Sequence, residues 1–429
     1  MAFQGVSLTL PDVSLFKFPP GTGAGFVPPP PPGTASFAPP IAIPDHVYQA
    51  VLDPKVPLTI AAVYAVTAKA LNSYNKSTGK KPWAISKTRA FRWFVIAHNI
   101  FLAVYSAWTW WGMFNALRRT MVSPMGPHGF AATVDSMCQI NGPGGFGNSV
   151  FWDEDSSSWK TLSGGVLTES AAASRFDGGR MWNEGLAFYG WLFYLSKFYE
   201  VFDTLIILAK GKLSSTLQTY HHAGAMMCMW AGMRYMSVPI WIFVFFNSFI
   251  HAIMYTYYSV TAFKIRVPMF IKRSLTSMQI TQFLVGGSGA MIHSFISYKI
   301  PVGAGSKTGA AASSASAVAN GSAGSSGSVK GVFEQQTVPC ITSSGTTFAI
   351  WLNVFYLAPL TYLFVAFFIE SYIRRSNAAS SKAKGSKPSD ATLVEKATWD
   401  AANNVKREVY GESKESVKKS NGRVLRSRQ

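Results

Sequence analysis

The chain has 429 residues, of which 48% are hydrophobic, 14% are aromatic and only 14% are charged. A soluble protein of this length would hold two or three domains, but so apolar a composition, with 13 Trp, favours a membrane protein. The net charge of +19 does not indicate nucleic-acid binding, because the cations lie in short loops between apolar stretches and in the C-terminal tail. That distribution is typical of topology signals and of attraction to anionic lipid. Three cysteines exclude a disulfide-rich scaffold and lack zinc-ligand spacing.

Residues 1–52 are rich in Pro and Gly and show no cleavable signal, so we expect an extended or disordered arm. Seven apolar stretches follow within residues 53–375, each judged against the roughly 20 residues that cross a bilayer. They are residues 56–71, 94–117, 186–208, 217–236, 239–263, 275–297 and 348–372. Residues 302–331 form a Gly/Ala/Ser-rich insert and residues 376–429 a basic disordered tail. The sequence therefore predicts an all-α integral membrane protein with seven transmembrane helices.

Loop charges predict the orientation, because Lys and Arg concentrate in cytoplasmic loops. With seven spans, all Lys- and Arg-rich connections fall on the side of the basic tail, and the acidic loop after the second span falls on the other side. The C-terminus would then be cytoplasmic and the N-terminus lumenal. Cys138 and Cys340 both fall in lumenal loops. In an oxidising compartment we expect a disulfide between them, which would tie the second loop to the start of the seventh span.

Four polar clusters interrupt the apolar stretches at helical spacing, so each lies on one helix face. They are Lys197, Glu200, Asp203 and Thr204; Gln218, His221 and His222; Asn247, His251, Tyr255 and Tyr258; and Thr276, Gln279 and Gln282, which follow Arg273. Ion pairs, interhelical hydrogen bonds or an interfacial tyrosine belt would explain several of these residues without any ligand. Ionisable groups at membrane depth are nevertheless expensive and often functional. Together the clusters predict a polar chamber open to the cytosol, with His251 in its deeper part.

The histidines leave three kinds of chemistry open. A membrane di-iron desaturase or hydroxylase needs more imidazole ligands than His221, His222 and His251, and Gln218 stands where a His-x-x-His-His box would begin. A non-enzymatic seven-helix transporter of lipid or acyl-CoA is compatible with the intramembrane charges. In covalent acyl chemistry, a neutral imidazole attacks a thioester, a second histidine assists, and basic residues hold the phosphates of coenzyme A.

At these residues the sequence resembles the very-long-chain fatty acid elongase family, the membrane 3-ketoacyl-CoA synthases. The shared motifs are Lys197-x-x-Glu200-x-x-Asp203-Thr204, Gln218-x-x-His221-His222, Asn247-x-x-x-His251-x-x-Met254-Tyr255-x-Tyr257-Tyr258 and Thr276-x-x-Gln279-x-x-Gln282. The resemblance implies that six of the seven helices form a barrel around an acyl tunnel. It implies condensation of a long-chain acyl-CoA with malonyl-CoA to 3-ketoacyl-CoA, CO2 and CoA, without metal or redox cofactor. It also implies residence in the endoplasmic reticulum membrane with other enzymes of the elongation cycle, and it leaves a homodimer open.

The resemblance also implies roles for individual residues. His221 would be the nucleophile that forms an acyl-imidazole, and His251 would act at the reacting carbonyl or malonyl unit. His222 and Gln218 would orient the site. Gln218 stands where most animal members have His; Gln occurs in a subset that includes elongases of polyunsaturated chains from algae and related eukaryotes, and also in fungal members. Contacts to substrate or coenzyme A are expected from Lys197, Glu200, Asp203, Thr204, Lys210, Asn247, Tyr255, Tyr258, Arg273, Thr276, Gln279 and Gln282. Residues 230–236 and 290–295 would set the tunnel depth and hence the chain length.

Overall fold

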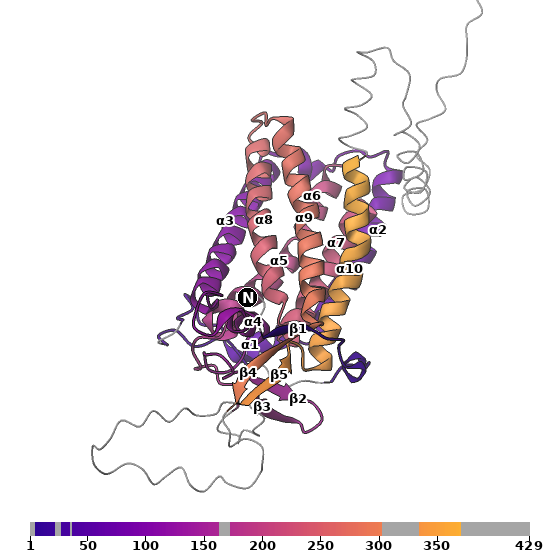
Figure 1. Ribbon diagram of the computed structural model, residues 1–429. Coiled ribbons are helices and arrows are strands. Elements are labelled where there is room, and N and C mark those ends of the chain that lie inside the picture. The colour runs from indigo at the N-terminus through magenta and orange to yellow at the C-terminus, as the bar shows by residue number, and fades with distance from the viewer. Residues whose placement is uncertain (1–4, 22–26, 35–36, 163–171, 303–333, 370–429) are drawn as a thin grey trace, which may run out of the picture.

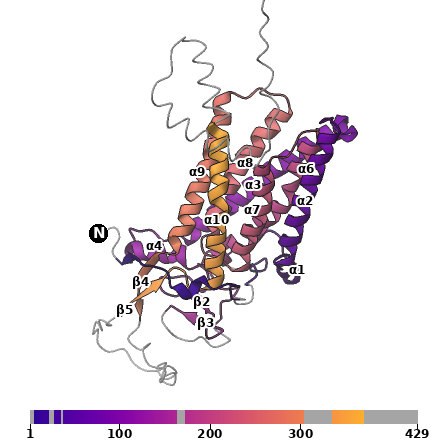
Figure 2. The same ribbon diagram turned by 90° about the vertical axis from the view of Figure 1, so that its right-hand side faces the viewer.

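The computed structural model describes residues 5–21, 27–34, 37–162, 172–302 and 334–369 (Figure 1). The long helices run side by side in one bundle, and the short strands gather at one end of it (Figures 1 and 2). Of the insert expected at residues 302–331, only Val302 is among the described residues, and the basic tail 376–429 lies wholly outside them.

The bundle has eight helices in the part of the chain that the structure describes. They are α2 (Lys55–Ser77), α3 (Arg89–Thr120), α5 (Ala187–Tyr199), α6 (Val201–Ala209), α7 (Thr216–Arg234), α8 (Ile240–Ala262), α9 (Met269–His293) and α10 (Ser344–Phe368). Each predicted apolar stretch coincides with one of these helices, except that the third is divided between α5 and α6 at Glu200. The sixth stretch was predicted too long, because α9 ends at His293 and strand β4 (Ile296–Val302) follows.

Three of the described helices, α3, α8 and α10, are long and apolar enough to cross a membrane. A fourth candidate is the pair α1 (Asp45–Val51) and α2, which are bent by 49° at a short break. The helices α5 and α6 are too short to qualify singly, since they contain 13 and 9 residues. The apolar helices identify a multi-pass membrane protein.

Capping side chains determine where two of the helices begin. Ser215 precedes α7 and its side chain accepts a hydrogen bond from the backbone N–H of Gln218, while Ser343 does the same for Thr346 at the start of α10. A fixed helix start also fixes which side chains share a face. Gln218, His221 and His222 are therefore presented from the first turns of α7.

A small β layer covers one end of the bundle. Strand β1 (Val6–Leu8) pairs antiparallel with β4, which pairs with β5 (Glu334–Pro339), and β2 (Val150–Asp153) forms a hairpin with β3 (Ser158–Thr161). The expectation of a wholly extended or disordered N-terminal arm is thus wrong for its described part. Strand β1 finds its hydrogen-bond partners on β4, a short 3-10 helix spans Val13–Phe16, and Trp182 Nε1 donates to the Val27 carbonyl at 2.6 Å.

The β layer is linked to the bundle by a disulfide and a buried polar network. Cys138 ends α4 (Gly129–Cys138), and it is joined to Cys340, which follows β5 and precedes α10. Close to it, Arg180 Nη1 lies 2.8 Å from Asp135 Oδ2 and Tyr298 Oη donates to Asp135 Oδ1 at 2.9 Å. The second loop and the start of α10 are therefore held together both covalently and by charge.

Candidate functional site

A polar chamber of about 680 Å³ lies among α3, α6, α7, α8, α9 and α10. Its wall includes residues of the connection between α6 and α7 and of the adjacent ends of α8 and α9. The connection between α8 and α9 is at the end of the bundle away from the β layer (Figure 2). The structure brings most of the sequence-predicted site residues together in the chamber wall: Glu200, Asp203, Lys210, Gln218, His221, His222, His251, Tyr255, Tyr258, Thr276, Gln279 and Gln282. Residues from four separate sequence motifs thus share one space.

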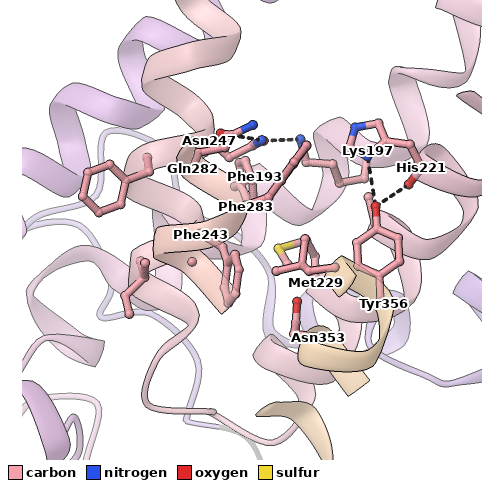
Figure 3. A pocket seen from close by; sticks show the side chains of 15 residues that line it. Phe193, Lys197, His221, Met229, Phe243, Asn247, Gln282, Phe283, Asn353 and Tyr356 are labelled. Atoms are coloured by element: carbon pink, nitrogen blue, oxygen red, sulfur yellow. Dashed lines mark hydrogen bonds between the residues drawn. The ribbon is translucent and has the colours of Figure 1, made fainter. Parts of the chain in front are cut away.

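A narrower apolar cavity of about 40 Å³ lies next to the chamber, toward the β layer. Its wall includes Phe193, Met229, Ile242, Phe243 and Gly286, and Figure 3 shows several of these side chains around it. None of the residues at 230–236 or 290–295 is in this wall. Their expected role in setting the depth of an acyl tunnel stays a prediction.

Three side chains, His221, Gln282 and Phe283, line both the chamber and the apolar cavity. His221 is therefore at the junction between a polar and an apolar space. The apolar cavity is much the smaller of the two, so a long acyl chain could enter it only if aromatic side chains in its wall move.

Glu200 is the centre of one buried network. Its Oε1 atom lies 2.7 Å from Lys197 Nζ and 3.4 Å from His251 Nδ1, and its Oε2 atom lies 4.0 Å from His222 Nδ1. Since a carboxylate accepts hydrogen bonds, it favours the tautomer of His251 that carries its proton on Nδ1 and leaves Nε2 unprotonated. Among the described residues, Glu200 Oε2 has no hydrogen-bond partner.

The same network extends across three helices. Lys197 Nζ donates to Asn247 Oδ1 at 3.0 Å, and Asn247 Nδ2 donates to Gln282 Oε1 at 3.3 Å, as the dashed lines in Figure 3 show. Lys197 and Asn247 line the apolar cavity, while Gln282 reaches both spaces. These residues therefore form a polar rim between the two spaces.

Asp203 belongs to a second network. Its Oδ1 atom lies 2.9 Å from His98 Nε2 of α3, and its Oδ2 atom accepts a hydrogen bond from Tyr255 Oη. The ring of His98 also stacks on Tyr199. Sequence reasoning missed His98, because no residue near it in the sequence identifies its partner.

His221 has a partner that sequence reasoning also missed. Tyr356 of α10 places its hydroxyl oxygen 3.0 Å from His221 Nδ1 and donates to the His221 backbone carbonyl at 2.9 Å (Figure 3). In the sequence, Tyr356 is one of several aromatic residues in an apolar stretch and belongs to none of the four motifs.

Two predicted contact residues, Thr204 and Arg273, line neither the chamber nor the apolar cavity. Thr204 Oγ1 lies 2.8 Å from Tyr64 Oη of α2, and Thr204 lines an apolar groove between α2 and α6. Lys272 and Arg273 are both exposed, but of the two only Lys272 is in the chamber wall. A shift of one position rotates a side chain by about 100° around a helix, so these neighbouring cations point in different directions.

Lys210, Lys212 and Lys272 give the chamber mouth a positive charge. Burial, and then the neighbouring charge of Lys212, lower the pKa of Lys210 from its usual value. Bound phosphate would relieve this repulsion. For a metal, the residues described include no group of three or more His, Cys, Asp or Glu side chains placed to hold one.

Comparison with known proteins gives the family. Residues 49–380 match the model of the ELO family, described as GNS1/SUR4. Among similar proteins are long chain fatty acid elongase 1 of Caenorhabditis elegans, with 36% identity over 22% of this chain and 33% of the relative, and fatty acid elongase 2 of Trypanosoma brucei brucei, with 32% identity over 28% and 44%. Very long chain fatty acid elongase 3 of Homo sapiens is 36% identical over 24% and 38%. The matched segments thus span less than half of each relative. Because the family model covers most of its length, the chain belongs to the ELO family.

Proposed function

We propose that this chain is a fatty acid elongase that catalyses the condensing step, as a very-long-chain 3-oxoacyl-CoA synthase. The observation that carries the proposal is the position of His221, at the junction of a polar chamber with a positive mouth and an apolar cavity. An acyl-CoA has a charged coenzyme A on one side of its thioester carbonyl and an apolar chain on the other. Its carbonyl carbon would therefore lie where a polar space meets an apolar one. The names of the relatives, which are fatty acid elongases, point to the same reaction.

In the proposed first step, Nε2 of neutral His221 attacks the acyl thioester. The new bond joins Nε2 to the carbonyl carbon, the carbon–sulfur bond breaks, and CoA leaves as a thiolate that takes a proton from solvent. The ring then carries the acyl group and one positive charge. His251, whose Nδ1 faces Glu200, would direct Nε2 toward the reacting carbonyl or the malonyl unit.

In the second step, malonyl-CoA loses CO2 and its two remaining carbons become an enolate. The enolate carbon attacks the acyl carbon, the bond to Nε2 breaks, and His221 returns to its neutral form. The product is a 3-ketoacyl-CoA two carbons longer than the substrate. The atoms and charges balance without a metal or redox cofactor.

The rest of the arrangement follows from this reaction. The seven predicted spans would enclose the tunnel, with six helices as its barrel, and the basic mouth would face the cytosol, where both CoA esters are found. The β layer and the disulfide would then lie in the lumen of the endoplasmic reticulum. The 3-ketoacyl product requires reduction and dehydration, so other enzymes of the elongation cycle would share the membrane. Gln218 lines the chamber where most animal members have His. Because the subset with Gln that the sequence resembles includes elongases of polyunsaturated chains, such chains would be among the substrates.

The test is elongation by the full-length protein in membranes of a host that lacks this activity. Membranes would receive radiolabelled malonyl-CoA with stearoyl-, oleoyl- or arachidonoyl-CoA, and the labelled 3-ketoacyl product would be measured. We expect product with the wild type and none with His221→Ala at equal protein level. Wild-type membranes that lengthen none of these chains, or that only move acyl-CoA across the bilayer, would contradict the proposal.

A further inference from the structure

We propose that Tyr356 is a positioning residue for His221: its hydroxyl accepts the proton on His221 Nδ1 and thereby leaves Nε2 free to take the acyl group. This inference rests on the proposed function, since it concerns how the nucleophile of that reaction is prepared. It assigns a role to a residue of α10, which lies outside all four sequence motifs.

The direction of the hydrogen bonds follows from the available protons. The Tyr356 hydroxyl has one proton, and the backbone carbonyl of His221, at 2.9 Å, can only accept it. The hydroxyl oxygen keeps its lone pairs and lies 3.0 Å from His221 Nδ1. It is therefore placed to accept a proton from Nδ1, which fixes the ring as the Nδ1–H tautomer.

This tautomer is the one that acyl transfer requires. With the proton on Nδ1, the lone pair that attacks is on Nε2, and among the described residues Nε2 of His221 has no hydrogen-bond partner. A free imidazole divides its proton between both nitrogens. The contact with Tyr356 removes the unproductive form.

The same contact gains strength during the first step. Acylation of Nε2 places a positive charge on the ring, while the Nδ1 proton stays in place. A hydrogen bond from a cationic donor is about twice as strong as one from a neutral donor. The Tyr356 oxygen thus stabilises the acyl-imidazolium more than the free imidazole, which accelerates the step.

The surroundings hold Tyr356 in this position. Gly224 lies one turn after His221 on α7, and a Cβ atom there would lie 2.1 Å from Tyr356 Cε2, so only a glycine leaves space for the ring. Tyr220 packs its ring against that of Tyr356, with centroids 5.5 Å apart. The Tyr220 hydroxyl donates to the Tyr356 backbone carbonyl at 3.2 Å, which does not fix the Tyr356 side chain. The hydroxyl of Tyr356 is therefore aimed by the packing of α7 on α10.

The test compares Tyr356→Phe with Tyr220→Phe in the full-length purified protein. Both variants lose one tyrosine hydroxyl from the same helix contact, but only Tyr356→Phe removes the acceptor for His221 Nδ1. The probe is oleoyl- or arachidonoyl-CoA without malonyl-CoA, and the measurement is the rate of thiol release in a single turnover. Steady-state kcat and KM with malonyl-CoA present, and the unfolding temperature, complete the comparison.

We expect thiol release to slow about 10- to 100-fold in Tyr356→Phe, with KM for acyl-CoA and the unfolding temperature close to those of Tyr220→Phe. Tyr220→Phe should release thiol at the wild-type rate. Equal rates in the two variants, with an active wild type, would overturn this inference alone. A wild type that forms product without releasing any thiol before malonyl-CoA is added would overturn the covalent step and this inference with it. A wild type that does neither would contradict the proposed function itself.

Discussion

Lys197 Nζ and Glu200 Oε1 lie 2.7 Å apart, and both side chains are almost completely buried. Breaking such a pair leaves one uncompensated buried charge, which costs about 3–5 kcal/mol. Lys197→Met or Glu200→Gln alone should therefore lower the unfolding temperature more than the double variant, in which no charge is left. Thermal unfolding in detergent measures this. A double variant no more stable than either single variant would show that the two charges are not coupled.

The same variants separate stability from catalysis. Glu200 also faces Nδ1 of His251 and His222, so the double variant should regain stability without regaining elongation of labelled malonyl-CoA. An active double variant would mean that Glu200 serves only as the partner of Lys197.

The sequence predicted the helices and motif histidines well, for a physical reason. Residues three or four apart on one helix share a face whatever the tertiary structure, so the clustering of His221 with Gln218 could be read directly. The partners from other helices could not be predicted in this way. His98 contacts Asp203 across about a hundred positions, and Tyr356 reaches His221 from α10, which depends on how the helices pack and rotate.

His98 and His293 offer a matched pair, since neither has a polar motif around it in the sequence. His98 Nε2 lies 2.9 Å from Asp203 Oδ1, whereas His293 Nδ1 has, among the described residues, the Gly289 carbonyl of its own helix as its sole hydrogen-bond partner. His98→Phe should remove one of the two partners of the Asp203 carboxylate, the other being Tyr255. The position of Tyr255 in the chamber wall should then be less well fixed. We expect a fall of about tenfold in kcat/KM, the factor for about 1.4 kcal/mol.

His293→Phe is the control for this substitution. It lies at the end of α9 near the β layer and does not line the chamber, so elongation should stay near the wild-type rate. Steady-state kinetics at matched protein level check both variants. Equal activity of His98→Phe and wild type would contradict a role for the Asp203 network in the chamber.

Lys272 and Arg273 are adjacent cations with different surroundings. Both are exposed, but Lys272 lines the chamber while Arg273 is absent from its wall. If the mouth binds the phosphates of coenzyme A, Lys272→Ala should raise KM for the CoA esters about 5- to 10-fold, and added salt should reduce the difference from wild type. Arg273→Ala removes an equal charge and should change KM little. A larger rise of KM in Arg273→Ala than in Lys272→Ala would place the coenzyme A site on the outer face of α9.

The disulfide between Cys138 and Cys340 closes a loop of 202 residues in sequence separation. Removal of a native disulfide from a small secreted domain typically costs about 2–5 kcal/mol of stability. We expect the double variant Cys138→Ser, Cys340→Ser to lose stability of this order. Cys228 is buried and free, so Cys228→Ser is the control. Reducing agent should lower the unfolding temperature of the wild type but not that of the double variant. A wild type insensitive to reductant would show that the bridge does not form in the membrane.

Phe243, near the start of α8, is in the wall of the apolar cavity. Burial of each methylene group of the acyl chain contributes about 0.8 kcal/mol to binding. The depth of the cavity therefore determines which chain length binds best. Phe243→Ala should deepen the cavity and extend the longest product. Gly286 faces Phe243, and a Cβ atom at Gly286 would lie 2.8 Å from Phe243 Cε1, so Gly286→Val should close the cavity and shorten the products.

The opposite signs make this pair of variants informative, because a general loss of folding would lower all chain lengths together. Leu284→Ala on the same helix is the control, since Leu284 is 58% exposed and is not in the cavity wall. Fatty acids from membranes expressing each protein would be profiled by gas chromatography after feeding oleate or arachidonate. Products that lengthen with Phe243→Ala and shorten with Gly286→Val would place the chain end at Phe243. Unchanged profiles in both variants would mean that the acyl chain leaves the chamber by another route, such as the groove between α2 and α6.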